Sequence, residues 1–297
     1  MSHQPELLRR LENLDQMPTI PVVLGPLLRY LEQPLETLEV QPIVELISQD
    51  KSLAAQCLHM ANSPLYGRWQ QIDSIRGAVV ALGLQRMRDI AVSCSILRIT
   101  PSGKSPLDPL TFWEHSLGCA LVCRQFARRI DFRDPAKAYL GGLLHDIGIV
   151  AELSLLPKEF QAAFEQARSQ GTPLHDVEMN SFGFTHCDVG KLVAEKWHFT
   201  PDLVTVVGCH HDPHTATGNR DLTALVALGD LLCRMSGLGH GYVEEVQVDF
   251  VEEPSFTLLL EECPNLKAFD WARLTFEIEA YMEEVHRLVG VLYRAGR

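Results

Sequence analysis

Residues 141–148 read GGLLHDIG, in which His145 and Asp146 stand side by side after a run of apolar and small residues. Apolar side chains at helical spacing predict a helix from Pro135 to Ile147 that opens on a proline, as helices often do. The same spacing predicts six more helices around it. They are expected at residues 112–130, 157–170, 173–180, 186–197, 201–211 and 222–235.

The N-terminal part of the chain shows the same helical spacing. Helices are expected at residues 5–16, 22–31, 42–48, 53–61, 74–82 and 84–97. Two prolines, Pro18 and Pro21, break the chain after the first of these, and Asn62-Ser63-Pro64 is a strong stop signal after the fourth. Ser74 is a typical N-cap, and Gly83 is a typical residue at a helix end.

Residues 100–109, TPSGKSPLDP, are rich in proline, serine and glycine, a composition that indicates a linker. This predicts an N-terminal helical lobe over residues 1–105, a second helical bundle over 106–240 and a C-terminal helical extension over 241–297. Within the extension we expect an irregular connection and then a closing helix or pair of helices at 269–293. The predicted fold class is all-α, a two-lobed helical bundle.

Composition excludes several classes of protein. The 297 residues are 46% hydrophobic, which is typical of a packed globular chain and excludes disorder as the main theme. The 26 Lys and Arg against 38 Asp and Glu give a formal charge of −12, which disfavours binding to nucleic acid or to an anionic membrane. The first twenty residues carry Glu, Arg and Asp rather than a secretory core, so we expect a cytoplasmic protein whose eight cysteines are reduced.

The second half of the chain concentrates histidine and aspartate at helix positions. These candidates are His115, the pair His145-Asp146, His186, the pair His210-His211, and Asp230. Imidazole and carboxylate suit Fe, Mn, Zn or Ni, and ligands that project inward from several helices are typical of metal sites in bundle cores. Adjacent residues on a helix point about 100° apart, so each pair could serve two neighbouring ions. Asp146 could bridge them through both carboxylate oxygens, which makes a dinuclear site geometrically possible.

Each candidate also has an explanation without metal. His115 alone could be a core histidine, His145-Asp146 a charge pair at a helix end, and His210-His211 a pair that interacts with a helix dipole. Cys119 and Cys123 could form a thiolate site with His115, although buried packing is the commoner role of such cysteines. Asp230 argues for metal, since it sits within the apolar segment LVALGDLLC, where an unpaired carboxylate would be costly to bury.

The order His115, His145-Asp146, Asp230 resembles the H…HD…D signature of the HD superfamily of metal-dependent phosphohydrolases. A more specific resemblance covers residues 17–235. It is carried by MPTIPVV, LISQDKSLAAQCLHMANSPLYG, SIRGAVVALG, FWEHS, GGLLHDIG and VVGCHHDP, in that order. Together these segments resemble an HDOD domain, the HD-related output domain of bacterial signalling proteins. The resemblance implies an all-α bundle with an HD-like metal-site lobe and a regulatory role.

HDOD domains are generally regarded as degenerate HD domains that lack some metal ligands, whereas this chain retains a candidate at every step. Similarity to the HD-GYP phosphodiesterases implies two ligand sets that share Asp146. The first set is His115, His145, Asp146 and Asp230, and the second is Asp146, His186, His210 and His211. Two departures argue against cyclic di-GMP hydrolysis: Ile149 stands where those enzymes have a lysine, and HHDPHTATG after Cys209 lacks their GYP segment.

We therefore expect one or two transition-metal ions, with Fe or Mn favoured and Zn or Ni as alternatives. The expected role is regulation through a signalling protein partner. The alternative is a metal-dependent phosphohydrolase, acting on a cyclic dinucleotide, a nucleotide or another phosphorylated small molecule, with Asp146 as its catalytic residue. Asp146→Ala should remove more metal than any other single change, whereas His240→Ala and His286→Ala should change nothing.

Overall fold

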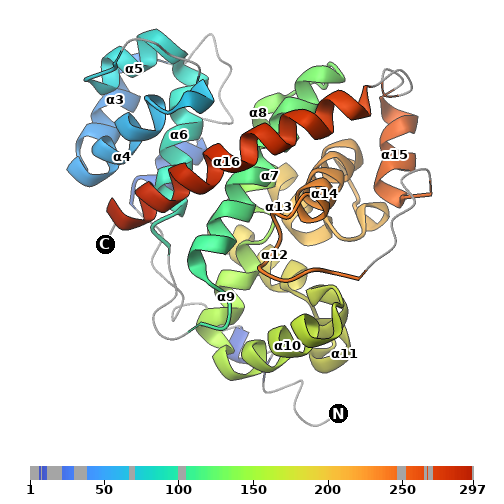
Figure 1. Cartoon of the computed structure of the whole chain (residues 1–297). Helices are drawn as coiled ribbons and strands as arrows, with labels where there is room; N and C mark the ends of the chain where they lie inside the picture. The colour runs from blue at the N-terminus through green and yellow to red at the C-terminus, as the bar shows by residue number, and fades with distance from the viewer. Residues whose placement is uncertain are drawn as a thin grey trace. The chain divides into compact units, whose positions relative to one another are not determined.

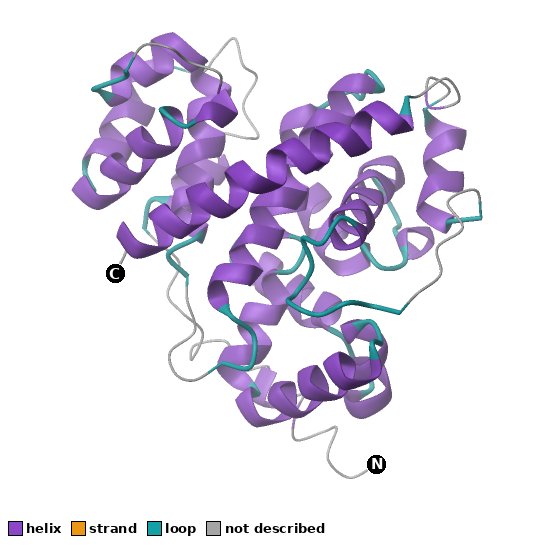
Figure 2. Ribbon diagram, viewed as in Figure 1, coloured by secondary structure: helices purple, strands orange, loops and turns teal. Residues whose placement is uncertain are grey.

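A computed structural model describes residues 7, 9–11, 22–29, 39–66, 71–99, 105–245, 252–263, 266 and 270–295. All regular structure in these ranges is helical, and Figure 2 shows no strand among them. The predicted all-α fold class is confirmed. The break expected at Pro18 and Pro21 lies outside the described residues, as does most of the helix expected at 5–16.

The chain divides into two compact units. The site unit comprises Met1–Pro18 and Thr100–Glu279, and the second unit comprises Thr19–Ile99 and Ala280–Arg297. This grouping differs at both chain ends from the division expected at residues 105 and 240. Leu7 and Leu11 are buried, and Arg10 pairs with Glu159 at 2.6 Å, so the N-terminal helix belongs with the site unit.

The second unit contains short helices whose ends follow the sequence signals. They are α2 (Leu24–Arg29), α3 (Val40–Ser48), α4 (Lys51–Ala61), η3 (Pro64–Tyr66), α5 (Ile75–Leu82), α6 (Leu84–Ile96) and the last part of α16 (Trp271–Ala295). Ser74 caps α5 by accepting a hydrogen bond from the Gly77 N–H at 3.1 Å. Gly83, with a φ of 87°, separates α5 from α6 because few other residues tolerate that conformation.

The site unit contains most of the described helices. Its helices are α7 (Pro109–Arg129), α8 (Pro135–Leu144), α9 (Ile147–Leu155), α10 (Pro157–Gln170), α11 (Leu174–Phe182), α12 (His186–Lys196), α13 (Pro201–Cys209), η4 (Pro213–Thr215), α14 (Arg220–Met235), α15 (Pro254–Glu262) and the start of α16. Helix α7 packs against α8 and α14, while α12 packs against α9 and α13 (Figure 1). The candidate ligands lie on the helices of these two groups.

Two helices of the site unit differ from the sequence expectation. The helix predicted from Pro135 to Ile147 ends at Leu144, and Ile147 begins a separate helix, α9, that we did not predict. Asp146 lies between them with φ −93° and ψ 15°, and this turn is invisible to hydrophobic periodicity because both sides are apolar. Helix α15 was also not predicted. Residues 243–245 are irregular as expected, and residues 246–251 lie outside the described ranges.

Two glycines of the GGLLHDIG segment permit close helix packing. A Cβ at Gly142 would lie 2.7 Å from the Cys119 carbonyl, so α8 approaches the backbone of α7. A Cβ at Gly148 would lie only 1.9 Å from the His186 carbonyl oxygen, so α9 approaches the start of α12. Glycine is required at both contacts, which bring His145 and Asp146 close to the histidines of the neighbouring helices.

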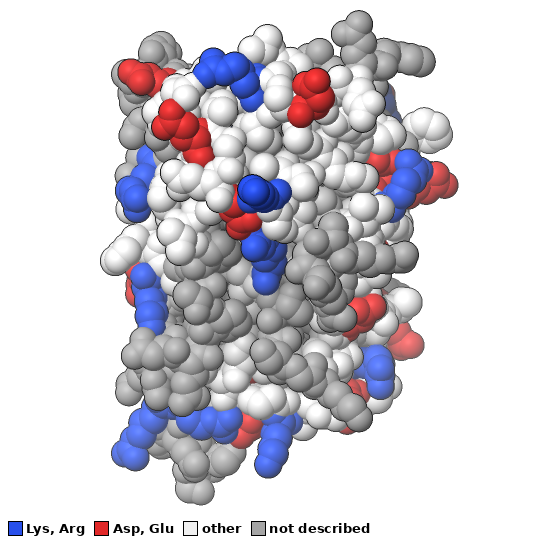
Figure 3. Space-filling view, turned by 90° about the vertical axis from the view of Figure 1, so that its left-hand side faces the viewer, with Lys and Arg blue, Asp and Glu red and all other residues white. Residues whose placement is uncertain are grey.

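The segment Pro135–Leu155 has the length and composition of a membrane-spanning helix, but 89% of its apolar window is buried inside the protein. The turn at His145 and Asp146 also divides it into two helices. On the face drawn in Figure 3, basic and acidic side chains are interspersed rather than gathered into one basic patch.

Candidate metal centre

All seven predicted site residues lie together in the site unit. His115 is in the first half of α7, His145 and Asp146 form the turn between α8 and α9, and Asp230 is on α14. His186 is the first residue of α12, and the pair His210-His211 follows α13. The two adjacent pairs therefore follow the last residues of α8 and α13, whereas we predicted each pair within the last turn of a helix. Six of the seven side chains are buried and His211 is half-buried.

The carboxylate of Asp146 is the centre of the cluster. Its Oδ1 lies 3.3 Å from His186 Nε2 and 3.4 Å from His210 Nε2. Its Oδ2 lies 3.3 Å from His115 Nε2 and 3.1 Å from His145 Nε2. Each oxygen therefore faces a different pair of histidines, which is the arrangement expected of a carboxylate between two ions.

The remaining two candidates extend this arrangement on either side. Asp230 Oδ1 lies 3.2 Å from His115 Nε2, and so joins the group at Oδ2 of Asp146. His211 Nε2 lies 3.1 Å from His186 Nε2, and so joins the group at Oδ1. The structure thus assembles the same two sets that the HD-GYP resemblance implied, with Asp146 common to both.

Hydrogen bonds at the opposite ring nitrogen orient these histidines. His115, His145 and His210 donate Nδ1–H to the carbonyl oxygens of Leu238, Gly142 and Val207, at 2.5, 2.8 and 3.1 Å. A carbonyl can only accept, so Nδ1 carries a proton and Nε2 is the ring atom that faces Asp146. In the neutral ring Nε2 presents a lone pair, and in the protonated ring it donates an N–H. A proton or a metal ion between each Nε2 and the carboxylate removes the repulsion between their lone pairs.

Distances and space in the cluster fit a bound ion. Nitrogen and oxygen ligands about 2.0–2.2 Å from one ion lie roughly 3 Å apart, close to the separations found around Asp146. A cavity of about 10 Å³, roughly the space of one water molecule, is lined by Asp146, His186, His211, Asp230 and His240 among others. The donor set and its geometry thus suit a transition metal, as the sequence predicted.

The charges of the cluster favour a cation at its centre. Burial opposes ionisation of Asp146, yet the charge of His145 and hydrogen bonds from the surrounding histidines hold its pKa well below the usual range. Burial likewise opposes protonation of His210, but the neighbouring Cys187 and Asp146 raise its pKa to about 10. The cluster therefore attracts positive charge, and protons occupy it when no metal does.

Two cysteines lie within reach of the ligand sets. Cys119 Sγ is 3.6 Å from His115 Nε2, and Cys187 Sγ is 3.8 Å from His210 Nε2. Each can therefore join a group of potential ligands, Cys119 with His115, His145 and Asp230, and Cys187 with His186, His210 and His211. In contrast, Cys123 packs against Gly229, where an added Cβ would lie 2.4 Å from its Sγ.

Three further residues at the site were not predicted. His240 Nε2 lies 2.9 Å from Asp146 Oδ2, so His240, which we expected to be a control residue, lies within the cluster. Glu178 on α11 accepts hydrogen bonds from His186, and Arg234 donates from Nε to both oxygens of Asp230, at 3.2 and 3.0 Å. The glycines around His240 in GLGHGY and the i,i+4 spacing of Asp230 and Arg234 were the available sequence signals.

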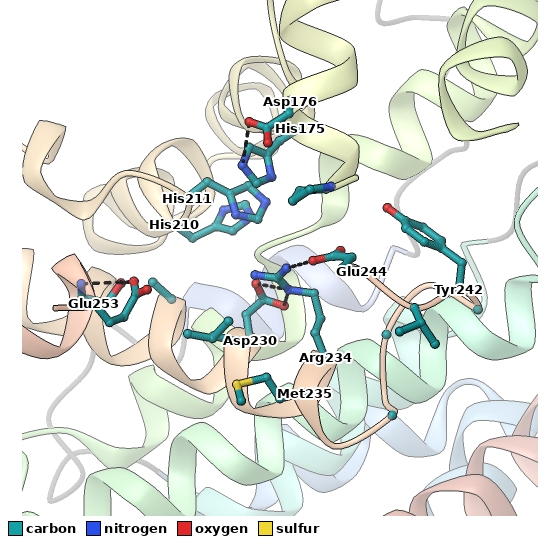
Figure 4. A pocket seen from close by; sticks show the side chains of 18 of the residues that line it. His175, Asp176, His210, His211, Asp230, Arg234, Met235, Tyr242, Glu244 and Glu253 are labelled. Carbon is teal, nitrogen blue, oxygen red and sulfur yellow. Dashed lines mark hydrogen bonds and ion pairs between the residues drawn. The ribbon is translucent and has the colours of Figure 1, made fainter. Parts of the chain in front are cut away.

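A pocket of about 880 Å³ lies beside the cluster and reaches His210, His211 and Asp230. Figure 4 shows Arg234 at its centre, between the carboxylates of Asp230 and Glu244. The His175 ring stacks on His211 with centroids 3.9 Å apart. A small molecule in this pocket would therefore contact candidate ligands from both sets.

Comparisons with known proteins agree with this fold. A curated relative, an uncharacterized protein of Treponema pallidum (strain Nichols), is 25% identical over 225 residues, which are 75% of this chain and 43% of the relative. The chain thus spans less than half of that relative's length. A solved HDOD domain protein of unknown function from Geobacter sulfurreducens is 29% identical, with a TM-score of 0.83 and 98% of each chain covered.

A solved protein of Shewanella amazonensis SB2B, provisionally named a phosphohydrolase, has the same fold. It is 24% identical, with a TM-score of 0.72, and the alignment covers 99% of this chain and 100% of the other. The sequence model of the HDOD domain matches residues 17–213, two thirds of the chain, in agreement with the motifs found above. The chain belongs to the HDOD domain family.

Proposed function

We propose that this HDOD protein is a metal-dependent phosphohydrolase. One observation carries the proposal: the two oxygens of Asp146 face two separate groups of ligands, and the pocket reaches members of both groups. A purely structural cluster would not require that opening. Two divalent ions held there would supply Lewis acidity toward phosphate oxygens and toward an attacking water.

The side chains divide into two ligand groups around Asp146. His115, His145 and Asp230 would hold one ion with Asp146 Oδ2, and His186, His210 and His211 would hold the other with Oδ1. Carbonyl and carboxylate acceptors at Nδ1 fix the ring orientations in advance. Histidine with carboxylate favours Fe or Mn, while the nearby Cys119 and Cys187 keep Zn among the alternatives.

Arg234 is the residue of this chain best placed to position the phosphate end of a substrate. It orients Asp230 through Nε and lines the pocket beside the ligands. Arg234 already forms ion pairs with Asp230 and Glu244. No other Lys or Arg is among the described residues that line the pocket. The residues Asp176, Glu244, Glu252 and Glu253 make the rest of the wall acidic.

This balance of charge predicts the kind of substrate. An acidic wall repels polyphosphates, whereas a phosphodiester or phosphomonoester with hydroxyl or amino groups can donate hydrogen bonds to it. The pocket volume of about 880 Å³ is within the usual range for small-molecule sites, roughly 300–1,000 Å³. We therefore propose a phosphorylated small molecule, with cyclic dinucleotides and nucleoside monophosphates as the first candidates.

The test is hydrolysis by protein loaded with Fe²⁺ or Mn²⁺. The substrates are cyclic dinucleotides, nucleoside monophosphates and a chromogenic phosphodiester, and released product is measured. Turnover should be abolished in Asp146→Ala and kept in His286→Ala, whose exposed side chain lies in the second unit. Turnover that persists in Asp146→Ala, or absence of turnover on all three substrate classes, contradicts the proposal.

A regulatory role without hydrolysis is the second candidate. It is favoured by the acidic lining of the pocket and by the ion pairs that Arg234 already forms with Asp230 and Glu244. In that role the metal would hold one conformation of the site unit, and a signalling protein partner would bind the metal-loaded and metal-free forms with different affinities. Metal loading without turnover of any substrate would favour this candidate.

A further inference from the structure

His240 is bound to the centre of the candidate metal site although it belongs to no element of the HD signature. It follows α14 in an irregular segment, and its Nε2 lies 2.9 Å from Asp146 Oδ2. Its ring centroid is 4.6 Å from that of His115, and the side chain is only 8% exposed. The potential ligand atoms of His115, Asp146 and His240 form a group within 4.8 Å of one another.

Three imidazole nitrogens surround the same carboxylate oxygen. His115, His145 and His240 place Nε2 at 3.3, 3.1 and 2.9 Å from Asp146 Oδ2. The first two rings direct Nε2 at that oxygen, because their Nδ1–H groups are committed to carbonyls. A cation placed among these atoms would satisfy all three nitrogens and the oxygen together, whereas a hydrogen bond from His240 would satisfy only one of them.

The residues around His240, which we name the His240 segment (residues 237–245), also form a wall of the pocket. Gly237, Gly239, Gly241, Tyr242, Val243 and Glu244 of this segment line it. The segment is attached to the site at two more points. The Leu238 carbonyl accepts the Nδ1–H of His115, and Glu244 pairs with Arg234.

The backbone of the His240 segment can adopt more than one course. Gly237 and Gly241 have φ angles of 86° and 88°, and glycine tolerates this region and its mirror image equally well. The segment has no regular helix of its own after Met235. Its position therefore depends on its contacts with the site through Leu238, His240 and Glu244, and on the hydrogen bonds of Tyr242 and Glu245 to residues 171–172.

We propose that His240 is an additional metal ligand, which binds the ion held by His115 and Asp146 and thereby fixes the pocket wall when that ion is present. The inference rests on the metal site of the proposed function but not on hydrolysis. Metal occupancy and the shape of the pocket are then linked: the segment is held against the site with the ion and released without it.

The experiment uses the full chain with Co²⁺ as the probe. Hydrogen exchange of residues 237–245 is measured with and without Co²⁺, and the visible absorption of bound Co²⁺ reports its ligands. In the wild-type protein, Co²⁺ should slow exchange in the His240 segment. In His240→Ala this slowing should disappear, the absorption spectrum should change and Co²⁺ affinity should fall about tenfold or more. His286→Ala is the matched control and should behave as the wild type.

His240→Gln separates a ligand from a hydrogen-bond donor. The glutamine amide can still donate to Asp146 but is a poor transition-metal ligand, so His240→Gln should behave like His240→Ala. If it restores wild-type behaviour, or if both variants leave the spectrum and the exchange unchanged, His240 is not a ligand while the proposed metal site stands. If the wild-type chain takes up no Co²⁺, both proposals fail. Thermal melting of each variant identifies a loss of fold, and the wild-type exchange comparison does not depend on any variant.

Discussion

Glu178 accepts two hydrogen bonds from His186, one from the ring Nδ1–H at 2.7 Å and one from the backbone N–H at 2.9 Å. Both residues are buried, so the carboxylate fixes the ring and directs Nε2 toward Asp146. A carboxylate behind a ligating histidine also increases the basicity of the ring. This pair extends the site to α11, a helix that carries none of the predicted ligands.

Two neighbouring buried glutamates of the site unit, Glu152 and Glu178, should respond differently to neutralisation. Burial and the charge of Glu178 raise the pKa of Glu152, so Glu152 takes up a proton more readily than Glu178 does. Burial opposes ionisation of Glu178, but the charge and hydrogen bonds of His186 lower its pKa. Glu178→Gln should therefore weaken metal binding about 10–100-fold, as loss of such a partner typically does.

Glu152→Gln is the matched control, because it makes the same change at a buried glutamate whose pKa is raised rather than lowered. It should leave metal affinity unchanged. Titration of both variants with metal in a calorimeter measures the two affinities. Equal affinities in the two variants would show that the Glu178 carboxylate does not support His186.

Gly148→Ala should disrupt the contact between α9 and α12. The added Cβ would lie 1.9 Å from the His186 carbonyl oxygen, a backbone atom that can move only with its helix. We expect a loss of about 1–3 kcal/mol or more in the free energy of unfolding, together with weaker metal binding, because His186 must shift. Urea denaturation and metal analysis measure both effects.

Gly208→Ala on α13 is the control for this substitution. Its Cβ would meet only the flexible Lys191 side chain, at 3.4 Å, so the helix should gain roughly 0.5–1 kcal/mol from the better helix former. A Gly148→Ala protein as stable as the Gly208→Ala protein would mean that α9 and α12 are not in close contact.

Asp146→Ala should remove more metal than loss of a histidine from either group. His115 faces only Oδ2 and His186 only Oδ1, so His115→Ala and His186→Ala should each mainly affect one ion. Elemental analysis of the three purified variants gives the comparison. The shared role of Asp146 is contradicted if its variant retains as much metal as either histidine variant.

Metal removal should lower the melting temperature. An ion present at about 100 times its dissociation constant stabilises the folded state by about 2.7 kcal/mol, which corresponds to roughly 5–10 °C for a domain of this size. Differential scanning fluorimetry before and after treatment with a chelator measures the change. Asp146→Ala should show no shift with the chelator, and an equal shift there would mean that the stabilising metal is bound elsewhere.

The sequence alone was sufficient to predict the helical class. It was also sufficient to name the seven candidate ligands that lie together in the structure. Helical periodicity is a local property, so the bounds of α4, α5, α6 and α10 could be read from apolar spacing, caps and prolines. Residue types such as Asp230 in an apolar helix also indicate a buried polar site without any knowledge of the fold. The order of the motifs was also sufficient to identify the HDOD family.

Tertiary structure determined how those residues act together. Asp146 and His240 are 94 residues apart and meet through an irregular segment, which has no periodicity to reveal its course. The break between α8 and α9 arises within a continuous apolar run, where both neighbours favour a helix. Which oxygen of Asp146 faces which histidine, and that Glu178 stands behind His186, depend on close packing between helices. Such contacts result from the simultaneous fit of distant surfaces, and no local stretch of sequence specifies them.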